Sequence, residues 1–206
     1  GVSFLANTRG ELARVRLAIP GHFSVENALA ALGIALQLDM PLADAAKALA
    51  TATGVKGRVE VVPTDTDYTV LIDYAHSPDG VENVLRAVRG FAKGRVVALF
   101  GCGGDREEDK RPLMGRIACA YADQVVLCDD NPRTEDPDRI LAQIAAGCDG
   151  SQKIIRDRAE AIKFVLDGAQ TDDIIVVAGK GGETSLIQDT AKTCPNDRLL
   201  IERYFG

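Results

Sequence analysis

The sequence predicts an α/β fold with a doubly wound, mostly parallel sheet, and three observations lead to it. Short apolar runs rich in β-branched residues alternate with segments of helical periodicity. The last four of these runs are hydrophobic almost throughout, as strands covered on both faces must be. Charged or glycine-rich segments follow the runs directly, which is where parallel sheets bind their ligands.

The first part of the chain has a different pattern, and we expect residues 1–56 to form a separate unit. Residues 1–20 alternate between apolar and polar side chains like a short hairpin. Residues 24–39 and 41–52 carry apolar side chains at helical spacing and predict two helices. Two glycines within residues 54–58 then break the pattern, so we expect a hinge there.

Strands and helices alternate in residues 57–206, which we expect to form a Rossmann-like domain. The apolar runs predict strands at residues 58–63, 68–74, 95–101, 124–129, 153–157 and 173–179. The segments between them predict helices at residues 78–91, 110–121, 137–147 and 158–168. The tail after Glu183 has no clear pattern.

Composition excludes several functional classes. Hydrophobic residues make up 46% of the 206 residues, so the chain can bury a core. The net charge of -6 and the absence of tryptophan argue against binding to nucleic acid or an anionic membrane. Five scattered cysteines without a CxxC pair indicate reduced thiols rather than a zinc site. We therefore expect a cytoplasmic monomer without nucleic-acid or membrane partners and without metal ligands of its own.

Five charged or glycine-rich segments follow predicted strands and should meet at one edge of the sheet. They are DYAHSP, GCGGDREEDKRP, DDNPRTEDP, DRAEA and GKGGE, which begin at residues 73, 101, 129, 157 and 179. The glycines of the second segment permit close approach of an anion, and Arg106, Lys110 and Arg111 add positive charge. Neither this segment nor GKGGE has the spacing of a P-loop. Each is equally consistent with a tight turn after a buried strand.

Asp73 and His76 lie at the end of a predicted strand. A lone histidine is more often a hydrogen-bonded structural residue than a catalyst. The spacing supports no serine or cysteine nucleophile with a partnered base, so we assign no catalytic residue.

The segment DDNPR places one cation among several carboxylates. Pro132 biases Asn131 toward an extended conformation, so Asp130 and Arg133 can point the same way. A carboxylate beside a guanidinium is what a free amino acid needs, for its ammonium and its carboxylate respectively. Arg106 and Glu183 could supply a second such set for a ligand with two amino-acid ends. On spacing alone, an Asx-type turn with a surface ion pair is the favoured reading.

Taken together and in this order, the segments from DYAHSPDG to GKGGE resemble the C-terminal domain of the Mur ligases. PGHFSVENALAALGIA, in the first part of the chain, resembles the end of that family's central ATPase domain. The resemblance implies an ATP- and Mg²⁺-dependent amide ligation in peptidoglycan synthesis. The substrate carboxylate is phosphorylated to an acyl-phosphate, and the amino group of the incoming amino acid attacks it and releases phosphate. The DNPR tetrad is typical of members that add meso-diaminopimelate to UDP-N-acetylmuramoyl-dipeptide.

The resemblance also implies site residues. Contacts to meso-diaminopimelate are implied for Arg106, Asp130, Asn131, Pro132, Arg133, Gly179 and Glu183. Contacts to ATP are implied for Asn27, Arg58, Asp73 and His76.

Three departures from the family pattern limit what this chain can do. The P-loop, the uridine-nucleotide domain and the modified lysine that helps hold magnesium are absent, and the chain begins without an initiator methionine. We therefore expect a fragment that neither hydrolyses ATP nor makes product alone, with Mg²⁺ held mainly by the missing part. Gly182 stands where relatives usually have histidine, and the tail follows the family pattern only loosely.

Two alternatives stay open. The first is a related amide ligase, of the murein-peptide-recycling or folylpolyglutamate type, against which DNPR argues. The second is a stand-alone module that senses an amino acid. A dinucleotide oxidoreductase is weaker still, because no GxGxxG follows the first strand.

Overall fold

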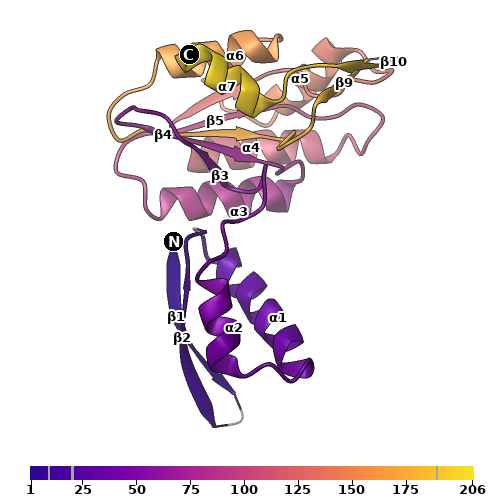
Figure 1. Cartoon of the computed structure of the whole chain (residues 1–206). Helices are drawn as coiled ribbons and strands as arrows, with labels where there is room; N and C mark the ends of the chain where they lie inside the picture. Colours follow the sequence, from indigo (N-terminus) through magenta and orange to yellow (C-terminus); the bar gives the residue numbers. More distant parts are fainter. Residues whose placement is uncertain (9, 20, 189) are drawn as a thin grey trace. The chain divides into compact units, whose positions relative to one another are not determined.

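The computed structural model forms two compact units, Gly1–Val55 and Lys56–Gly206, and each is described by itself (Figure 1). The residues that the structure describes are 1–8, 10–19, 21–188 and 190–206.

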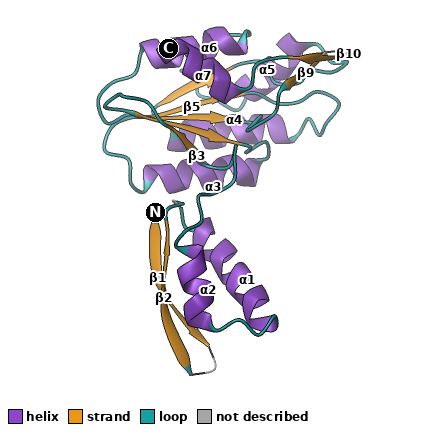
Figure 2. Cartoon of the chain, viewed as in Figure 1, coloured by secondary structure: helices purple, strands orange, loops and turns teal. Residues whose placement is uncertain are grey.

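The first unit is a hairpin covered by two helices (Figure 2). Strands β1 (Val2–Thr8) and β2 (Glu11–Leu17) pair antiparallel, which confirms the hairpin predicted from alternation, although Arg9 and Pro20 lie outside the described residues. Helices α1 (Phe23–Gln37) and α2 (Leu42–Leu49) contact each other, and α2 lies on β2. Their shared core is small and aliphatic, formed by Ala6, Val15, Leu32, Leu42, Ala45 and Ala46.

The second unit is built on one six-stranded sheet with the order β3-β4-β8-β5-β6-β7. The strand bounds are β3 Glu60–Val62, β4 Thr69–Asp73, β5 Val96–Phe100, β6 Gln124–Leu127, β7 Lys153–Ile154 and β8 Ile174–Ala178. Only β3 runs antiparallel to its neighbour, and the other pairs are parallel. The chain moves outward from β4 through β5 and β6 to β7, and then returns to insert β8 between β4 and β5.

Helices cover both faces of this sheet (Figure 1). Helices α3, α4 and α5 lie side by side on one face, and α6 and α7 cover the other. Their bounds are α3 Pro78–Arg89, α4 Lys110–Tyr121, α5 Pro137–Ala145, α6 Arg158–Asp167 and α7 Asp197–Phe205. The prediction of a doubly wound, mostly parallel α/β fold is confirmed.

Burial explains the continuously hydrophobic strands. All five residues of β5 and of β8 are buried, because helices pack on both faces of these central strands. The predicted strand at residues 153–157 is shortened to the two exposed residues of β7, which lies at the sheet edge. The core between the sheet and helix α6 includes Val70, Ile72, Val97, Leu99, Val126, Ile162, Val165, Ile175 and Val177.

Side-chain caps mark where α3, α5 and α6 begin after the strands, whereas α4 has no such cap. Ser77 accepts a hydrogen bond from the Gly80 amide, and Pro78 opens α3. Asp136 and Asp157 cap α5 and α6 in the same way. These caps end three of the loops at the carboxyl edge of the sheet.

The tail that the sequence left unassigned forms a hairpin and a helix. Strands β9 (Ser185–Gln188) and β10 (Thr190–Thr193) pair antiparallel, with Asp189 outside the described residues, and α7 follows. In the part of the chain that the structure describes, no helix combines the length and apolarity needed to cross a membrane.

Candidate functional site

The loops after the parallel strands contact one another at the carboxyl edge of the sheet, as predicted. The Gly104 amide donates to the Asn131 carbonyl at 2.9 Å, which joins the loops after β5 and β6. The Gly179 amide donates to the Asp73 carbonyl at 3.1 Å, which joins the loops after β8 and β4. A third hydrogen bond, from Asn131 Nδ2 to Glu183 Oε2, joins these two pairs, so four of the five segments form one surface rather than separate turns.

Arg133 holds the turn after β6 against two other segments. Its backbone has a φ of 54°, in the left-handed region, and its amide donates to the Ile187 carbonyl at 2.8 Å. Its guanidinium donates from Nη1 to the Gly104 carbonyl at 2.6 Å. The side chain is only partly exposed. The surface ion pair favoured by spacing alone is therefore wrong for this turn.

Asp130, three residues earlier, is 8% exposed. Within the described residues, its carboxylate makes no hydrogen bond and no ion pair. Burial lowers the pKa of Arg158, but Asp197 and then Asp130 raise it, so Asp130 interacts with this cation at longer range. Gly179 lies directly against it, since a Cβ atom at Gly179 would be 2.8 Å from Asp130 Oδ2. A buried carboxylate without a hydrogen bond or ion pair is costly, and such groups are typical of sites that receive a cationic ligand.

Asn131 lies at the centre of a buried polar network. Its Oδ1 accepts from Lys180 Nζ at 3.1 Å and from the Ile187 amide at 2.9 Å, and its Nδ2 donates to Glu183 Oε2 at 3.0 Å. Lys180 is 3% exposed and also donates to the Ser185 carbonyl at 2.7 Å. These bonds leave the Asn131 amide a single orientation.

Tyr74 connects the loop after β4 to Glu183. Its hydroxyl donates to Glu183 Oε1 at 2.9 Å, and this hydrogen bond raises the pKa of Tyr74. The Arg58 guanidinium lies 4.3 Å from the centre of the Tyr74 ring. His76 packs edge-on against the same ring at 4.8 Å, and its Nδ1 contacts the Tyr74 carbonyl at 2.8 Å. His76 and Arg58 are themselves exposed.

Asp73 organises the backbone near the start of the unit. Its carboxylate accepts from the Val59 amide at 2.8 Å and from the Ala75 amide at 2.7 Å. Burial raises the pKa of Asp73, although these two amides oppose the shift. Asn27 lies exposed on α1 in the other unit.

The basic residues of the glycine-rich loop have three different environments, which the sequence did not distinguish. Arg111 is fully buried and is bound to Glu135 and to the Gly103 carbonyl. Lys110 donates to the His76 carbonyl at 2.8 Å. Arg106 alone of the three is exposed, and it donates to the Asp105 carbonyl at 3.1 Å. The expectation that all three add charge for an anion is therefore wrong for Arg111.

Close backbone packing requires the glycines of this loop. A Cβ atom at Gly104 would lie 1.9 Å from the Pro132 carbonyl oxygen, and one at Gly101 would lie 2.1 Å from the Cys128 carbonyl oxygen. The glycines therefore allow the loop to approach the DNPR turn. Gly182, by contrast, has open space around the position of a Cβ atom.

Sequence reasoning missed Arg158 and Tyr74 as members of the site's framework. Arg158 pairs with Asp197 at 2.7 Å and donates to the Ala178 carbonyl at 2.9 Å and to Cys128 Sγ at 3.3 Å. It therefore supports the ends of β6 and β8 from beneath and attaches α7. Tyr74 lies between the predicted site residues Asp73 and His76, and this position in the sequence could have indicated that Tyr74 belongs to the site.

Comparisons with known proteins identify the family of this chain. The family described as "Mur ligase, glutamate ligase domain" matches residues 57–181, which is more than half of the chain. The chain belongs to the Mur ligase family. The predicted resemblance is confirmed.

Individual relatives of this Mur ligase chain cover nearly all of it. A UDP-N-acetylmuramoyl-L-alanyl-D-glutamate--2,6-diaminopimelate ligase from Caldanaerobacter subterraneus subsp. tengcongensis is 48% identical over 98% of the chain and 42% of that relative. The ligase of the same name from Syntrophomonas wolfei is 45% identical over 100% of the chain and 43% of that relative. A solved structure with this name has a TM-score of 0.72 and 37% identity, over 98% of the chain and 42% of that structure. The chain thus spans about two-fifths of the length of these relatives.

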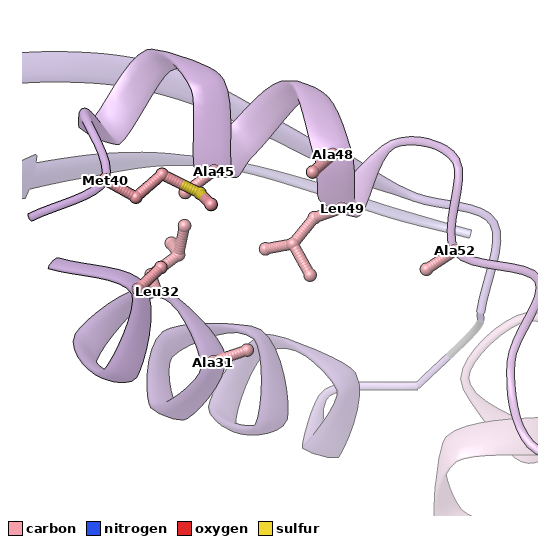
Figure 3. Close-up of a pocket in the computed structure, with 8 residues that line it drawn as sticks. Ala31, Leu32, Met40, Ala45, Ala48, Leu49 and Ala52 are labelled. Atoms are coloured by element: carbon pink, nitrogen blue, oxygen red, sulfur yellow. The ribbon is translucent and has the colours of Figure 1, made fainter. Parts of the chain in front are cut away.

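Two further features bear on what this Mur ligase chain can bind. Among the described residues, no three His, Cys, Asp or Glu side chains gather as a metal site. A cavity of about 230 Å³ lies between α1 and α2 (Figure 3). No predicted site residue lines it, and no polar side chain there would orient a ligand. Its lining is Ala31, Leu32, Ala35, Met40, Ala45, Ala48, Leu49 and Ala52.

Proposed function

We propose that this chain is the amino-acid-binding part of a ligase that joins meso-diaminopimelate to UDP-N-acetylmuramoyl-L-alanyl-D-glutamate. The names of its relatives support this function. Residues 57–206 supply the amino-acid site, and residues 1–56 are the end of the central ATP-binding domain. The enzyme is a monomer, and it works in the cytoplasm, where meso-diaminopimelate and the UDP-linked substrate meet.

One observation carries the proposal for the amino acid. Among the described residues, Asp130 is a buried carboxylate that makes no hydrogen bond or ion pair, and the Arg133 guanidinium is on the same turn. An ammonium group would neutralise Asp130, and a carboxylate would bind Arg133 in bidentate fashion. Together they match the far end of meso-diaminopimelate, which is a second amino-acid group. Lysine ends in an ammonium alone and would leave Arg133 unmatched.

The remaining predicted contacts complete the site. Glu183 presents a partly exposed carboxylate beside Asn131, and Gly179 permits close approach to Asp130. Pro132 is buried and sets the turn, while the exposed Arg106 adds a cation at the rim. These residues bind and orient the amino acid, so that its reacting amine faces the activated substrate.

ATP supplies the phosphoryl group that turns the substrate carboxylate into an acyl-phosphate. Arg58 and His76 are exposed at the edge of the sheet and could contact its phosphates or ribose, and Asp73 holds the backbone beside them. Asn27 would contact it from the first unit. Mg²⁺ would be held mainly by residues upstream of this chain. A hinge at residues 54–58 would let the amine approach while water is excluded from the acyl-phosphate.

Calorimetry of this chain with meso-diaminopimelate and with L-lysine tests the amino-acid site. We expect weak binding of meso-diaminopimelate, little binding of L-lysine, and no binding after Arg133→Ala. Arg116→Ala, on the exposed surface of α4, is the matched control and should bind like the unsubstituted chain. Equal binding of the two amino acids would contradict the proposed specificity.

The upstream coding sequence separates the ligase from a stand-alone amino-acid sensor. A GxxGKT-type loop encoded before residue 1 supports the ligase, because a P-loop would hold the ATP phosphates. A start codon directly before residue 1 would instead favour the sensor.

A further inference from the structure

Both carboxylate oxygens of Glu183 accept a hydrogen bond from a neutral side chain. Tyr74 donates its hydroxyl hydrogen to Oε1 at 2.9 Å, and Asn131 donates from Nδ2 to Oε2 at 3.0 Å. Among the side chains that the structure describes, the cation paired with Glu183 is Lys180, which lies 3.9 Å from Oε2. A carboxylate has about four acceptor positions, so two remain open. Glu183 is thus held in one plane while it keeps acceptor capacity for a ligand.

The Tyr74 hydroxyl is fixed because its ring is held on several sides. The Arg58 guanidinium stacks on one face at 4.3 Å, and His76 packs edge-on at 4.8 Å. Gly181 packs against the ring as well, since a Cβ atom there would lie 3.1 Å from Tyr74 Cβ and Cδ2. With χ1 and χ2 restrained in this way, the hydroxyl has little freedom away from Glu183.

Tyr74 also lies between two groups of proposed contacts. Arg58 and His76 on one side are proposed to contact ATP, and Glu183 on the other is proposed to contact the amino acid. Asn131 could orient Glu183 from below, but it reaches only Oε2. Without Tyr74, Oε1 would have no neighbour among the described side chains to hold it, and the carboxylate could rotate.

We propose that Tyr74 is a positioning residue that orients the Glu183 carboxylate to accept an ammonium group of the bound amino acid. This role rests on the proposed function, because it requires that Glu183 contact the amino acid. Because the Arg58 guanidinium stacks on the Tyr74 ring, Tyr74 contacts both a proposed ATP-binding residue and the proposed amino-acid-binding residue Glu183.

Tyr74→Phe removes only the hydroxyl and keeps the ring beneath Arg58. We expect meso-diaminopimelate affinity to fall on the order of tenfold, as for loss of a hydrogen bond to a charged group. Tyr121→Phe is the matched control, because the Tyr121 hydroxyl also donates to a glutamate, Glu82, at 3.2 Å. That pair joins α3 and α4 away from the loops, so this variant should bind with unchanged affinity.

A spectroscopic measurement separates positioning from a general structural effect. The pH titration of phenolate absorbance, taken as the difference between the unsubstituted chain and Tyr74→Phe, reports the pKa of Tyr74. Because the hydrogen bond to Glu183 raises that pKa, Glu183→Gln should bring it down. When Tyr74→Phe and Glu183→Gln are combined in one chain, their losses of meso-diaminopimelate affinity should not add, since each change removes the same hydrogen bond.

The outcomes are distinguishable. If the unsubstituted chain binds meso-diaminopimelate and Tyr74→Phe binds it with the same affinity, the role of Tyr74 is overturned and the proposed function is not. The role of Tyr74 is also overturned if Tyr121→Phe loses as much affinity as Tyr74→Phe, or if Glu183→Gln leaves the pKa of Tyr74 unchanged. An unsubstituted chain that binds no meso-diaminopimelate overturns the proposed function together with this role.

Discussion

Arg111 and Glu135 form a bidentate ion pair, with Nη1 and Nη2 of the guanidinium each 2.8 Å from a carboxylate oxygen. Arg111 is fully buried at the start of α4, and Glu135 follows the DNPR turn. Arg111 also donates to the Gly103 carbonyl, and Glu135 accepts from the Asp105 amide. One pair therefore holds the glycine-rich loop against the turn that carries Asp130 and Arg133.

Removing the charge of Glu135 should destabilise the second unit. Glu135→Gln leaves the buried Arg111 guanidinium without its counter-ion, so we expect the free energy of unfolding to fall by about 3 kcal/mol. Urea denaturation checks this value. Glu107→Gln is the control, since Glu107 is exposed, and it should change stability by less than about 0.5 kcal/mol. Equal effects of the two changes would mean that the buried pair is not what stabilises the loops.

The ion pair between Arg111 and Glu135 should make the free energy of unfolding fall at low pH. The hydrogen bonds from Arg111 lower the pKa of Glu135 from 4.5 to about 2. A carboxyl group whose pKa is lower in the folded state stabilises that state fully above its unfolded pKa. Its contribution is therefore complete above 4.5 and is lost as the pH falls toward about 2. Urea denaturation across this pH interval should show that the free energy of unfolding falls less in Glu135→Gln than in the unsubstituted chain. The same dependence on pH in both chains would contradict the assignment of this effect to Glu135.

A methyl group at Gly179 should disturb the amino-acid site. Gly179 has a φ of 108°, and a Cβ atom would lie 2.8 Å from Asp130 Oδ2. We expect Gly179→Ala to displace Asp130 and to weaken meso-diaminopimelate binding at least tenfold in calorimetry. Gly182→Ala in the same loop is the control, because no atom lies within 4 Å of its Cβ position. Comparable losses in both variants would show that the loop tolerates no side chain, whatever its effect on Asp130.

Asp130→Asn should separate binding from stability. In the described structure the buried carboxylate makes no hydrogen bond or ion pair, and Arg158, which it reaches only at longer range, keeps Asp197 as its ion-pair partner. We expect the free energy of unfolding to stay within about 0.5 kcal/mol of the original value or to rise. Calorimetry should at the same time show that meso-diaminopimelate binding is lost. A large loss of stability would instead assign Asp130 a structural role.

Local pattern was enough to predict most elements of the second unit. Strands β5, β6 and β8 and helices α3 to α6 begin and end within a few residues of their predicted bounds, because apolar periodicity and capping residues act over short stretches of chain. Asp130 and Arg133 could also be singled out from one pentapeptide. The tail could not be assigned, because β9 pairs with β10 and contacts the DNPR turn through backbone groups, which leave no trace in side-chain periodicity.

Long-range packing decided the roles of the site residues. The return of β8 between β4 and β5 brings Gly179 against Asp130 and Glu183 against Tyr74, although these partners are distant in the chain. The same packing buries Arg111 as a structural partner of Glu135 and leaves Arg106 exposed. Residue type and spacing specify which chemical groups each loop carries. Burial and the strand order decide which of those groups meet, because both arise only when distant segments pack together.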